Sequence, residues 1–435
     1  MPKIPAELLR NLANLSIPSA KPNSNSNLIE KAKSKVVNKL SKVLGKKASV
    51  VLPPGWSPTE HLALLKEASD ASRSILSMDK RVEFGSARGK LAALMLSKAK
   101  NIDFSDDADV LNWIRSVLEW RRSNHAYSTA LDIVSIPDEF TIAITGDWGT
   151  GMYGAQKSVA SINTSGADMF LHLGDIYYSG QLDEVRSRFI VPCSGLTNIS
   201  LKRACNGNHE MYSGGDGYFE DVFKAFNQKS SFFILQNSHF VLFGIDTAYD
   251  EDFDLKDKIL AGNLERDDFP LLTSQFAQIK EYASRLENAK KDVIIFSHHY
   301  PFSILDSDKI KILELAQDQL GKDFIEKRLR AWIFGHEHRC IRYLTSKKIP
   351  FEARCYGNGG VPQSRGKNAS AKDAVFVDIT GNGLEGKALD GKNQDIVGFE
   401  SEYIPHTYTL LRLQRNKIRE EIYLSNGTSV YNGAI

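Results

Sequence analysis

Residues 169–180 read MFLHLGDIYYSG, and this stretch decides which fold class the chain can adopt. Its apolar start is typical of a short buried β-strand, and the strand would end directly at Gly174 and Asp175. A second run, TIAIT at 141–145, ends in the same way at Gly146 and Asp147. A loop that follows a rigid strand can position a side chain accurately, so both carboxylates are candidates for a functional site.

Further short runs rich in β-branched and aromatic residues follow, with candidate helices between several of them. They are HFVLFGI (239–245), DVIIFS (292–297), AWIF (331–334) and AVFVDI (374–379). This order of strands and helices predicts an α/β or layered α+β domain. Two of these runs lead into SHH and GHEH, so polar side chains follow four of the predicted strands in total.

Five short segments therefore hold the residues able to perform chemistry. They are GDWGTG (146–151), LGDIYYSG (173–180), GNHE (207–210), SHHYP (297–301) and GHEH (335–338). Each segment alone could be an ordinary turn. Together they contain five of the ten histidines of the chain, two Asp and one Asn. Divalent and trivalent metal ions of hard to borderline character prefer this mixture of nitrogen and oxygen donors to thiolates.

Such a donor set suits the hydrolysis of a phosphoester. Water attacks a phosphoester slowly because both reactants are weakly activated and negative charge accumulates in the transition state. Two metal ions about 3.5–4 Å apart lower the pKa of a bound water, orient it and neutralise the phosphoryl oxygens. The segments offer a bridging carboxylate and a separate donor set for each ion, and so predict a dinuclear hydrolase that acts through a metal-bound hydroxide.

In this order the segments resemble the metallophosphoesterase (calcineurin-like phosphoesterase) superfamily. In detail they resemble its purple acid phosphatase branch, especially mammalian tartrate-resistant acid phosphatase. The usual superfamily opening is Asp-x-His, but here Gly149 stands where that His would be. Purple acid phosphatases share this exchange and pair a GDxG opening with GDxxY, whose Tyr phenolate binds ferric iron. Tyr178, and not Tyr177, is in register with that Tyr.

The resemblance implies a four-layer αββα sandwich that binds two metal ions, Fe(III) together with divalent Fe, Zn or Mn. The first ion would take Asp147, Asp175, Tyr178 and His338, and the second would share Asp175 and take Asn208, His299 and His336. His299 is preferred to His298 because the ligand of the family directly precedes x-Pro.

The resemblance also implies that His209 is the catalytic residue that contacts the phosphate or its leaving group, with Asn208 and His298 as further substrate contacts. Acid phosphatases carry another His shortly after the GHYP-like segment, but the corresponding stretch here, FSILDSD (302–308), has none. Asp306 or Asp308 could replace it only when protonated, because a carboxylate repels an anionic phosphate. We therefore expect the substrate or the pH optimum to differ from those of an acid phosphatase.

The motifs predict hydrolysis of a phosphomonoester, either a small molecule or a phosphoprotein. They do not separate this activity from that of a phosphodiesterase acting on nucleotides or lipid head groups. A non-catalytic binding protein that acts through its basic N-terminal arm is a third hypothesis, which the complete ligand set disfavours. Kinase-like phosphoryl transfer is disfavoured because the chain has no GxxxxGK[ST] loop.

Composition bounds the rest of the molecule. The 435 residues are 42% apolar and 25% charged, and a net charge of +2 gives no strong bias toward nucleic acid. Residues 1–50 alone carry +8, so we predict a basic, partly disordered arm with an amphipathic helix within 28–47. This helix is expected to pack its apolar stripe on the protein itself, and the alternative is a weak contact with a membrane surface or a partner. We predict a small helical module at 51–135 and the metallophosphoesterase domain at 136–435.

Two features suggest the environment of the protein. The sequence has no apolar run of about 20 residues and no secretory signal at its start, so a cytoplasmic enzyme is expected. Its four cysteines, Cys193, Cys205, Cys340 and Cys355, are too sparse for a disulfide framework and form no CxxC pair. We expect reduced thiols.

Overall fold

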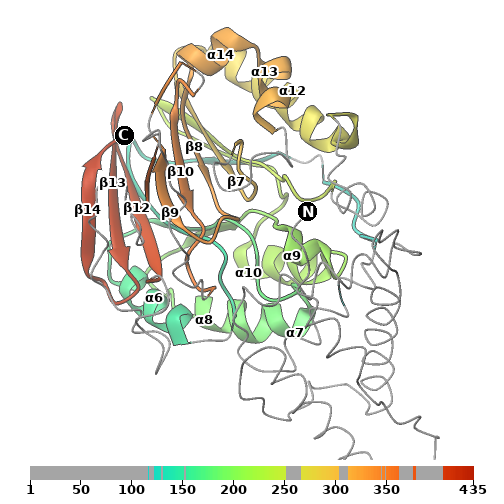
Figure 1. The fold of residues 1–435 in the computed structure, drawn as a ribbon, viewed down its shortest axis with the longest axis vertical. Helices are drawn as coiled ribbons and strands as arrows, with labels where there is room; N and C mark the ends of the chain where they lie inside the picture. Colours follow the sequence, from blue (N-terminus) through green and yellow to red (C-terminus); the bar gives the residue numbers. More distant parts are fainter. Residues whose placement is uncertain are drawn as a thin grey trace, which may run out of the picture. The chain divides into compact units, whose positions relative to one another are not determined.

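A computed structural model of the chain describes Ser116 and residues 122–128, 131–150, 153–250, 266–302, 312–343, 345–347, 349–361, 376–378 and 405–435 (Figure 1). The predicted basic arm, its helix and most of the helical module lie outside these residues, as do Asp306 and Asp308. The compact unit that contains both sheets begins at Arg121. Within the described part of the chain, no helix has the length and apolar character needed to cross a membrane.

The first sheet has six strands in the order β14-β13-β12-β2-β3-β4. The bounds are β2 Glu139–Thr145, β3 Met169–His172, β4 Leu201–Ala204, β12 Thr407–Gln414, β13 Lys417–Leu424 and β14 Ser429–Ala434. Strands β2, β3 and β4 are mutually parallel, whereas β12 pairs antiparallel with β2 and continues into an antiparallel hairpin with β13. The runs predicted at 141–145 and 169–173 are therefore neighbouring strands of one sheet.

The second sheet has eight strands in the order β1-β5-β6-β7-β8-β10-β9-β11. The bounds are β1 Asp132–Ser135, β5 Phe233–Gln236, β6 Phe240–Gly244, β7 Asp292–Ser297, β8 Leu329–Phe334, β9 Cys340–Tyr343, β10 Glu352–Tyr356 and β11 Phe376–Asp378. Strands β6, β7, β8 and β10 form a parallel block at its centre. The strands predicted from the other four apolar runs are all present in this sheet.

The helices cover the outer faces of the two sheets. Around the six-stranded sheet lie α6 Tyr153–Asn163, α7 Leu182–Glu184, η1 Val185–Ile190, α8 Val191–Cys193, α9 Asn208–Met211, η2 Gly217–Val222 and α10 Phe223–Phe226. Around the eight-stranded sheet lie α12 Pro270–Ser284, preceded by η3 Arg266–Asp268, with α13 Ile312–Leu320 and α14 Lys322–Lys327. Figure 1 shows α12, α13 and α14 grouped apart from α6 to α10.

Three apolar clusters hold these layers together. The central cluster joins the facing sides of the two sheets, for example Ile142 and Leu171 with Leu242 and Phe296, all fully buried. One outer cluster packs α12, α13 and α14 on the eight-stranded sheet, and the other packs α6, η1 and α10 on the six-stranded sheet. The order of layers is helix, sheet, sheet, helix, which confirms the predicted αββα sandwich.

The start of the domain differs from the predicted boundary. Residues 132–135, which the sequence placed in the helical module, form β1 and pair in parallel with β5. Asp132 on this strand is buried and forms an ion pair of 3.0 Å with Arg203 of β4. A strand of four residues is too short for its periodicity to distinguish it from a loop, and its partner β5 lies about a hundred residues later in the chain.

Candidate metal centre

The ends of five strands from both sheets meet at one place. Because β2, β3 and β4 are parallel neighbours, the residues that follow them lie at the same edge of their sheet. The residues that follow β7 and β8 lie at the corresponding edge of the other sheet. Two contacts join these edges: the main-chain N–H of His336 donates to Asp147 Oδ2 at 2.9 Å, and His298 Nε2 lies 3.2 Å from Asp175 Oδ1.

A first group of donors surrounds the phenol of Tyr177. Its hydroxyl lies 3.2 Å from Asp147 Oδ1, 3.1 Å from Asp175 Oδ2 and 2.6 Å from His338 Nε2. His338 Nε2 is also 3.4 Å from Asp147 Oδ1. Three predicted ligands of the first ion, Asp147, Asp175 and His338, are thus brought together, with Tyr177 at the position expected for Tyr178.

A second group of donors surrounds the imidazole of His298. Its Nε2 lies 3.0 Å from Asn208 Oδ1, 3.0 Å from His336 Nδ1 and 3.2 Å from Asp175 Oδ1. Three predicted ligands of the second ion, Asp175, Asn208 and His336, are therefore brought together as well. His298, which was predicted to contact substrate, lies at their centre.

The other predicted site residues border these groups. His299 directs Nδ1 to the carbonyl and hydroxyl oxygens of Thr247, at 3.2 and 3.1 Å, and its ring centroid is 4.6 Å from that of His336. His209 places Nδ1 2.6 Å from the carbonyl oxygen of Tyr178 and Nε2 3.7 Å from Asp175 Oδ2. All of these side chains belong to one contiguous and largely buried site.

The backbone of the candidate ligands is strained. Asp147, Asp175, His336 and His338 adopt φ values of +56°, +64°, +68° and +52°, in the left-handed region that costs a residue with a Cβ about 1–3 kcal/mol. Such strain persists only where the surrounding structure imposes it, and it concentrates at functional sites. The surrounding structure therefore holds these strand-end loops in a conformation that is unfavourable for the backbone but brings the candidate ligands together.

Glycines allow these loops to approach the carboxylates closely. A Cβ added to Gly207 would lie 2.3 Å from Asp175 Oδ1, and one added to Gly357 would lie 2.6 Å from Asp147 Oδ2. Neither position accommodates any side chain without displacing a candidate ligand. Gly357, which follows β10, was not singled out in the sequence, because a glycine after a short strand is usually an ordinary turn.

The electrostatics of the site favour cations. Burial by itself would lower the pKa of His298, but Asp175, Asp147 and Glu210 outweigh that effect and raise it to about 10. Burial would likewise raise the pKa of Asp175, but His209 and His298 hold it well below its usual value. The pocket thus stabilises positive charge between its carboxylates, and its nitrogen and oxygen donors are those that iron, zinc and manganese bind. The residues present fit two such ions.

Supporting residues that the sequence did not reveal hold the loops in place. Glu184 is buried, and its carboxylate accepts hydrogen bonds from the main-chain N–H groups of Tyr178, Ser179 and Gln181 at 2.9, 2.9 and 3.2 Å. The hydroxyl of Tyr212 accepts a hydrogen bond of 2.7 Å from the side-chain amide of Asn208, which leaves Asn208 Oδ1 directed at His298. Asn208 and Tyr212 are four residues apart, which places two side chains side by side on a helix, and this spacing is the sequence signal that could have identified Tyr212.

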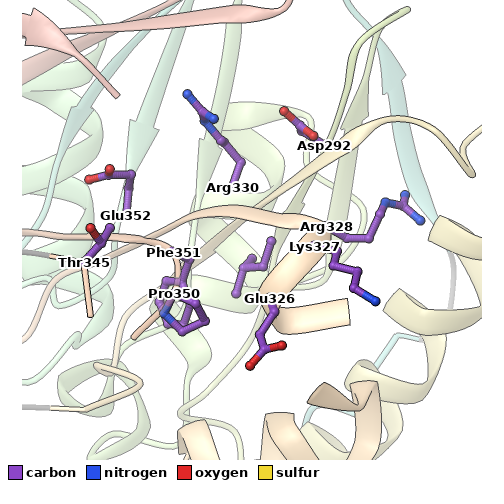
Figure 2. A pocket seen from close by; sticks show the side chains of 10 residues that line it. Asp292, Glu326, Lys327, Arg328, Arg330, Thr345, Pro350, Phe351 and Glu352 are labelled. Atoms are coloured by element: carbon purple, nitrogen blue, oxygen red, sulfur yellow. The ribbon is translucent and has the colours of Figure 1, made fainter. Parts of the chain in front are cut away.

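A separate pocket of about 210 Å³ lies at the opposite ends of β7 and β8 (Figure 2). Its charged lining is balanced, with Asp292, Glu326 and Glu352 opposed to Lys327, Arg328 and Arg330. The guanidinium of Arg328 is occupied by three main-chain carbonyl groups. The pocket contains none of the candidate ligands, so we assign the chemistry to the strand-end site.

A comparison with models of protein families agrees with this location of the site. The model of the calcineurin-like phosphoesterase family matches residues 140–340, a range that contains every candidate ligand from Asp147 to His338. Residues 140–340 therefore match a calcineurin-like phosphoesterase domain. No curated protein matches the chain.

Several solved structures resemble the chain at low identity, each over 68% of its length. A purple acid phosphatase, PPD1, from yellow lupin (Lupinus luteus) seeds is 13% identical, with a TM-score of 0.47 and 54% of that chain covered. GAP50, the anchor in the inner membrane complex of Plasmodium, is 13% identical, with a TM-score of 0.45 and 88% covered. A predicted phosphoesterase from Streptococcus pneumoniae is 10% identical, with a TM-score of 0.29 and 98% covered. The match thus spans about half of the lupin phosphatase.

Proposed function

We propose that this protein hydrolyses phosphomonoesters with a pair of metal ions, Fe(III) and a divalent Fe, Zn or Mn. One observation carries the proposal: the two oxygens of Asp175 face different donor groups. Oδ2 lies 3.1 Å from the Tyr177 hydroxyl in the first group, and Oδ1 lies 3.2 Å from His298 Nε2 in the second. A carboxylate shared in this way is the bridge that a dinuclear centre requires.

The chemistry divides between the ions and the protein. When bound, the two ions would act as Lewis acids that activate water and neutralise the phosphoryl oxygens. Asp147, Asp175 and Asn208 would hold and orient them from the six-stranded sheet, and His336 and His338 would do so from the eight-stranded sheet. The rigid strand ends keep these donors in place before a substrate arrives.

His209 is the group we propose to contact the phosphate or the leaving group. Its Nδ1 is held 2.6 Å from the Tyr178 carbonyl oxygen, so the ring keeps a fixed orientation and Nε2 remains near Asp175, at 3.7 Å. Burial lowers the pKa of His209, while Asp175 opposes this effect. We propose that His209→Ala lowers the rate while both metal ions stay bound.

The test compares two substrates on the purified full-length chain loaded with Fe(III) and Zn(II). We expect p-nitrophenyl phosphate to be hydrolysed at least tenfold faster than bis(p-nitrophenyl) phosphate, and both activities to disappear on chelation. Faster hydrolysis of the diester would contradict the proposed monoester specificity and favour a phosphodiesterase. A metal-loaded chain that hydrolyses neither ester would contradict catalysis and favour a binding protein that acts through residues 1–50.

A further inference from the structure

Two doublets in the site, Tyr177-Tyr178 and His298-His299, each offer two adjacent side chains for one ligand position. In both doublets the resemblance to purple acid phosphatases selects the second residue. In both, the structure places the first residue among the donors. We infer that Tyr177 and His298 are the metal ligands and that Tyr178 and His299 are not. This inference rests on the proposed dinuclear centre and specifies how this chain builds it.

The position of the Tyr177 hydroxyl is that of a ligand. Donors about 2.0–2.2 Å from one ion are separated from each other by about 3 Å. The hydroxyl lies 3.2, 3.1 and 2.6 Å from the nearest donor atoms of Asp147, Asp175 and His338. The Tyr177 side chain is fully buried. Four oxygen and nitrogen atoms from three strand-end loops therefore enclose one point in the protein.

The main chain around Tyr178 fixes this register. The N–H of Tyr178 donates to Glu184, and its carbonyl oxygen lies 2.6 Å from His209 Nδ1. The N–H of Ile176, on the other side of Tyr177, donates to Glu210 Oε1 at 3.1 Å. Shifting the loop by one residue to bring Tyr178 to the donors would break all three contacts. The loop thus selects Tyr177.

His298 has the two contacts typical of a metal-binding imidazole. Its Nε2 lies 3.0–3.2 Å from donor atoms of Asn208, His336 and Asp175, the separations expected around one ion. Its Nδ1 lies 3.0 Å from the carbonyl oxygen of Leu173, the kind of outer contact that fixes the orientation of a ligand ring. An added Cβ at Gly174 would lie only 2.8 Å from His298 Nδ1, so the neighbouring loop is shaped around this ring.

His299 has a similar outer contact, because its Nδ1 lies 3.2 Å from the carbonyl oxygen of Thr247, but it lies at the side of the second donor group. Both its main-chain N–H and its Nδ1 are directed at Thr247, the former 3.0 Å from the hydroxyl oxygen. Its ring lies beside that of His336, with centroids 4.6 Å apart, and one ring nitrogen each of His298, His299 and His336 lie within 4.8 Å of one another. The contacts of 3.0–3.2 Å to Asn208 and Asp175 are those of His298 Nε2. The structure therefore places His299 beside the second donor group.

The tyrosine pair is tested with Tyr177→Phe and its matched control Tyr178→Phe, each loaded with Fe(III). A tyrosinate ligand to Fe(III) gives a charge-transfer absorption in the visible and a tyrosinate difference spectrum in the ultraviolet. We expect Tyr177→Phe to lose both signals and Tyr178→Phe to keep both. The reverse result would overturn the inference, as would a wild-type protein that binds Fe(III) without either signal.

The histidine pair is tested with His298→Ala and its matched control His299→Ala. Metal content after loading with excess Zn(II) and dialysis against metal-free buffer is expected to fall from two ions to one in His298→Ala and to remain two in His299→Ala. His298→Asn, which keeps a polar side chain, provides a second variant if the alanine protein does not fold. Loss of one ion in His299→Ala, with two retained in a folded His298 variant, would overturn the assignment.

The same measurements separate this inference from the proposed function. A wild-type protein that binds two ions but hydrolyses no phosphoester would contradict the function, while the paired variants would still decide the ligands. An active protein in which Tyr178 or His299 proves to be the ligand would contradict only the inference. A wild-type protein that retains no metal ion overturns both.

Discussion

The sandwich contains two buried charged clusters, one around Glu420 and one at the metal centre, and they differ in their counter-charges. At Glu420 of β13, the carboxylate accepts hydrogen bonds from Arg354 at 3.0 Å, Arg342 at 3.2 Å and Tyr356 at 2.7 Å. At the metal centre, the ion pairs of Asp147 and Asp175 within the described residues involve only histidines. The Glu420 cluster contains permanently charged guanidinium groups, whereas the carboxylates of the metal centre face imidazole groups, which can also bind metal ions.

The backbone shows the same contrast. Glu420 lies in the regular hairpin of β12 and β13. Four candidate ligands at the metal centre instead lie on loops with positive φ. A buried ion pair within regular strands is part of the fold. Buried carboxylates on loops with a strained backbone are typical of a binding site. Each of the following experiments alters one of the two clusters.

The largest effect is expected from Asp175→Asn. The amide keeps the shape of the side chain but removes the charge shared by both donor groups, so we expect metal binding to fail and phosphatase activity to drop by at least a thousandfold, about 4 kcal/mol. Activity and metal content measure this effect. Asp183→Asn, an exposed carboxyl on α7, is the control and should change neither. Full activity in Asp175→Asn would remove the basis for a bridging carboxylate.

Glu420→Ala should act on stability instead. Removing one partner of a buried pair leaves Arg354, only 1% exposed, without its main counter-charge, at a cost of about 3–5 kcal/mol. Urea denaturation measures this loss, and metal content per folded molecule should be unchanged. The neighbouring Glu421→Ala is the control. It removes ion pairs with the more exposed Arg412 and Arg419, so its effect should be smaller. Equal losses would contradict the special role of the Glu420 cluster.

Metal removal should destabilise the protein through the other cluster. Ions that bind only the folded state stabilise it by about 2.7 kcal/mol at a hundred times their Kd. We expect a chelator to lower the melting temperature of the wild type and of Glu420→Ala by similar amounts, because the two clusters are separate. Thermal denaturation with and without chelator checks this. An unchanged melting temperature in the wild type would show that the metal centre does not couple to folding.

The smallest effect is expected from Tyr212→Phe. This change removes the hydroxyl that orients the amide of Asn208 but leaves the ring in place, so we expect affinity for one metal ion to fall about tenfold, or about 1.4 kcal/mol. Metal titration measures the change. Tyr218→Phe removes a hydroxyl that donates to the carbonyl of Ala204, away from the donor groups, and should leave the affinity unchanged. Equal affinities in wild type and Tyr212→Phe would assign Tyr212 to packing alone.

Much of this architecture could be predicted from short segments. The strands that carry Asp147, Asp175 and His336 were evident because a buried strand is an apolar run with an abrupt polar end. The donor types then indicated metals and a phosphoester. β1 and the C-terminal hairpin were less evident, because a short edge strand such as Asp132–Ser135 has no pattern distinct from a loop.

The donor types and the family resemblance also predicted that these segments would form one site, and the parallel strands then placed their ends at a shared edge. The local pattern did not determine which member of a doublet points inward. Tyr177 and Tyr178 are equally capable donors, and the choice between them depends on the loop shape set by Glu184, Glu210 and His209. For His298 and His299 it depends on Leu173 and Thr247, which lie 125 and 52 residues away in the sequence. Chemistry is encoded in residue type, but the direction of a side chain depends on long-range contacts that exist only in the folded chain.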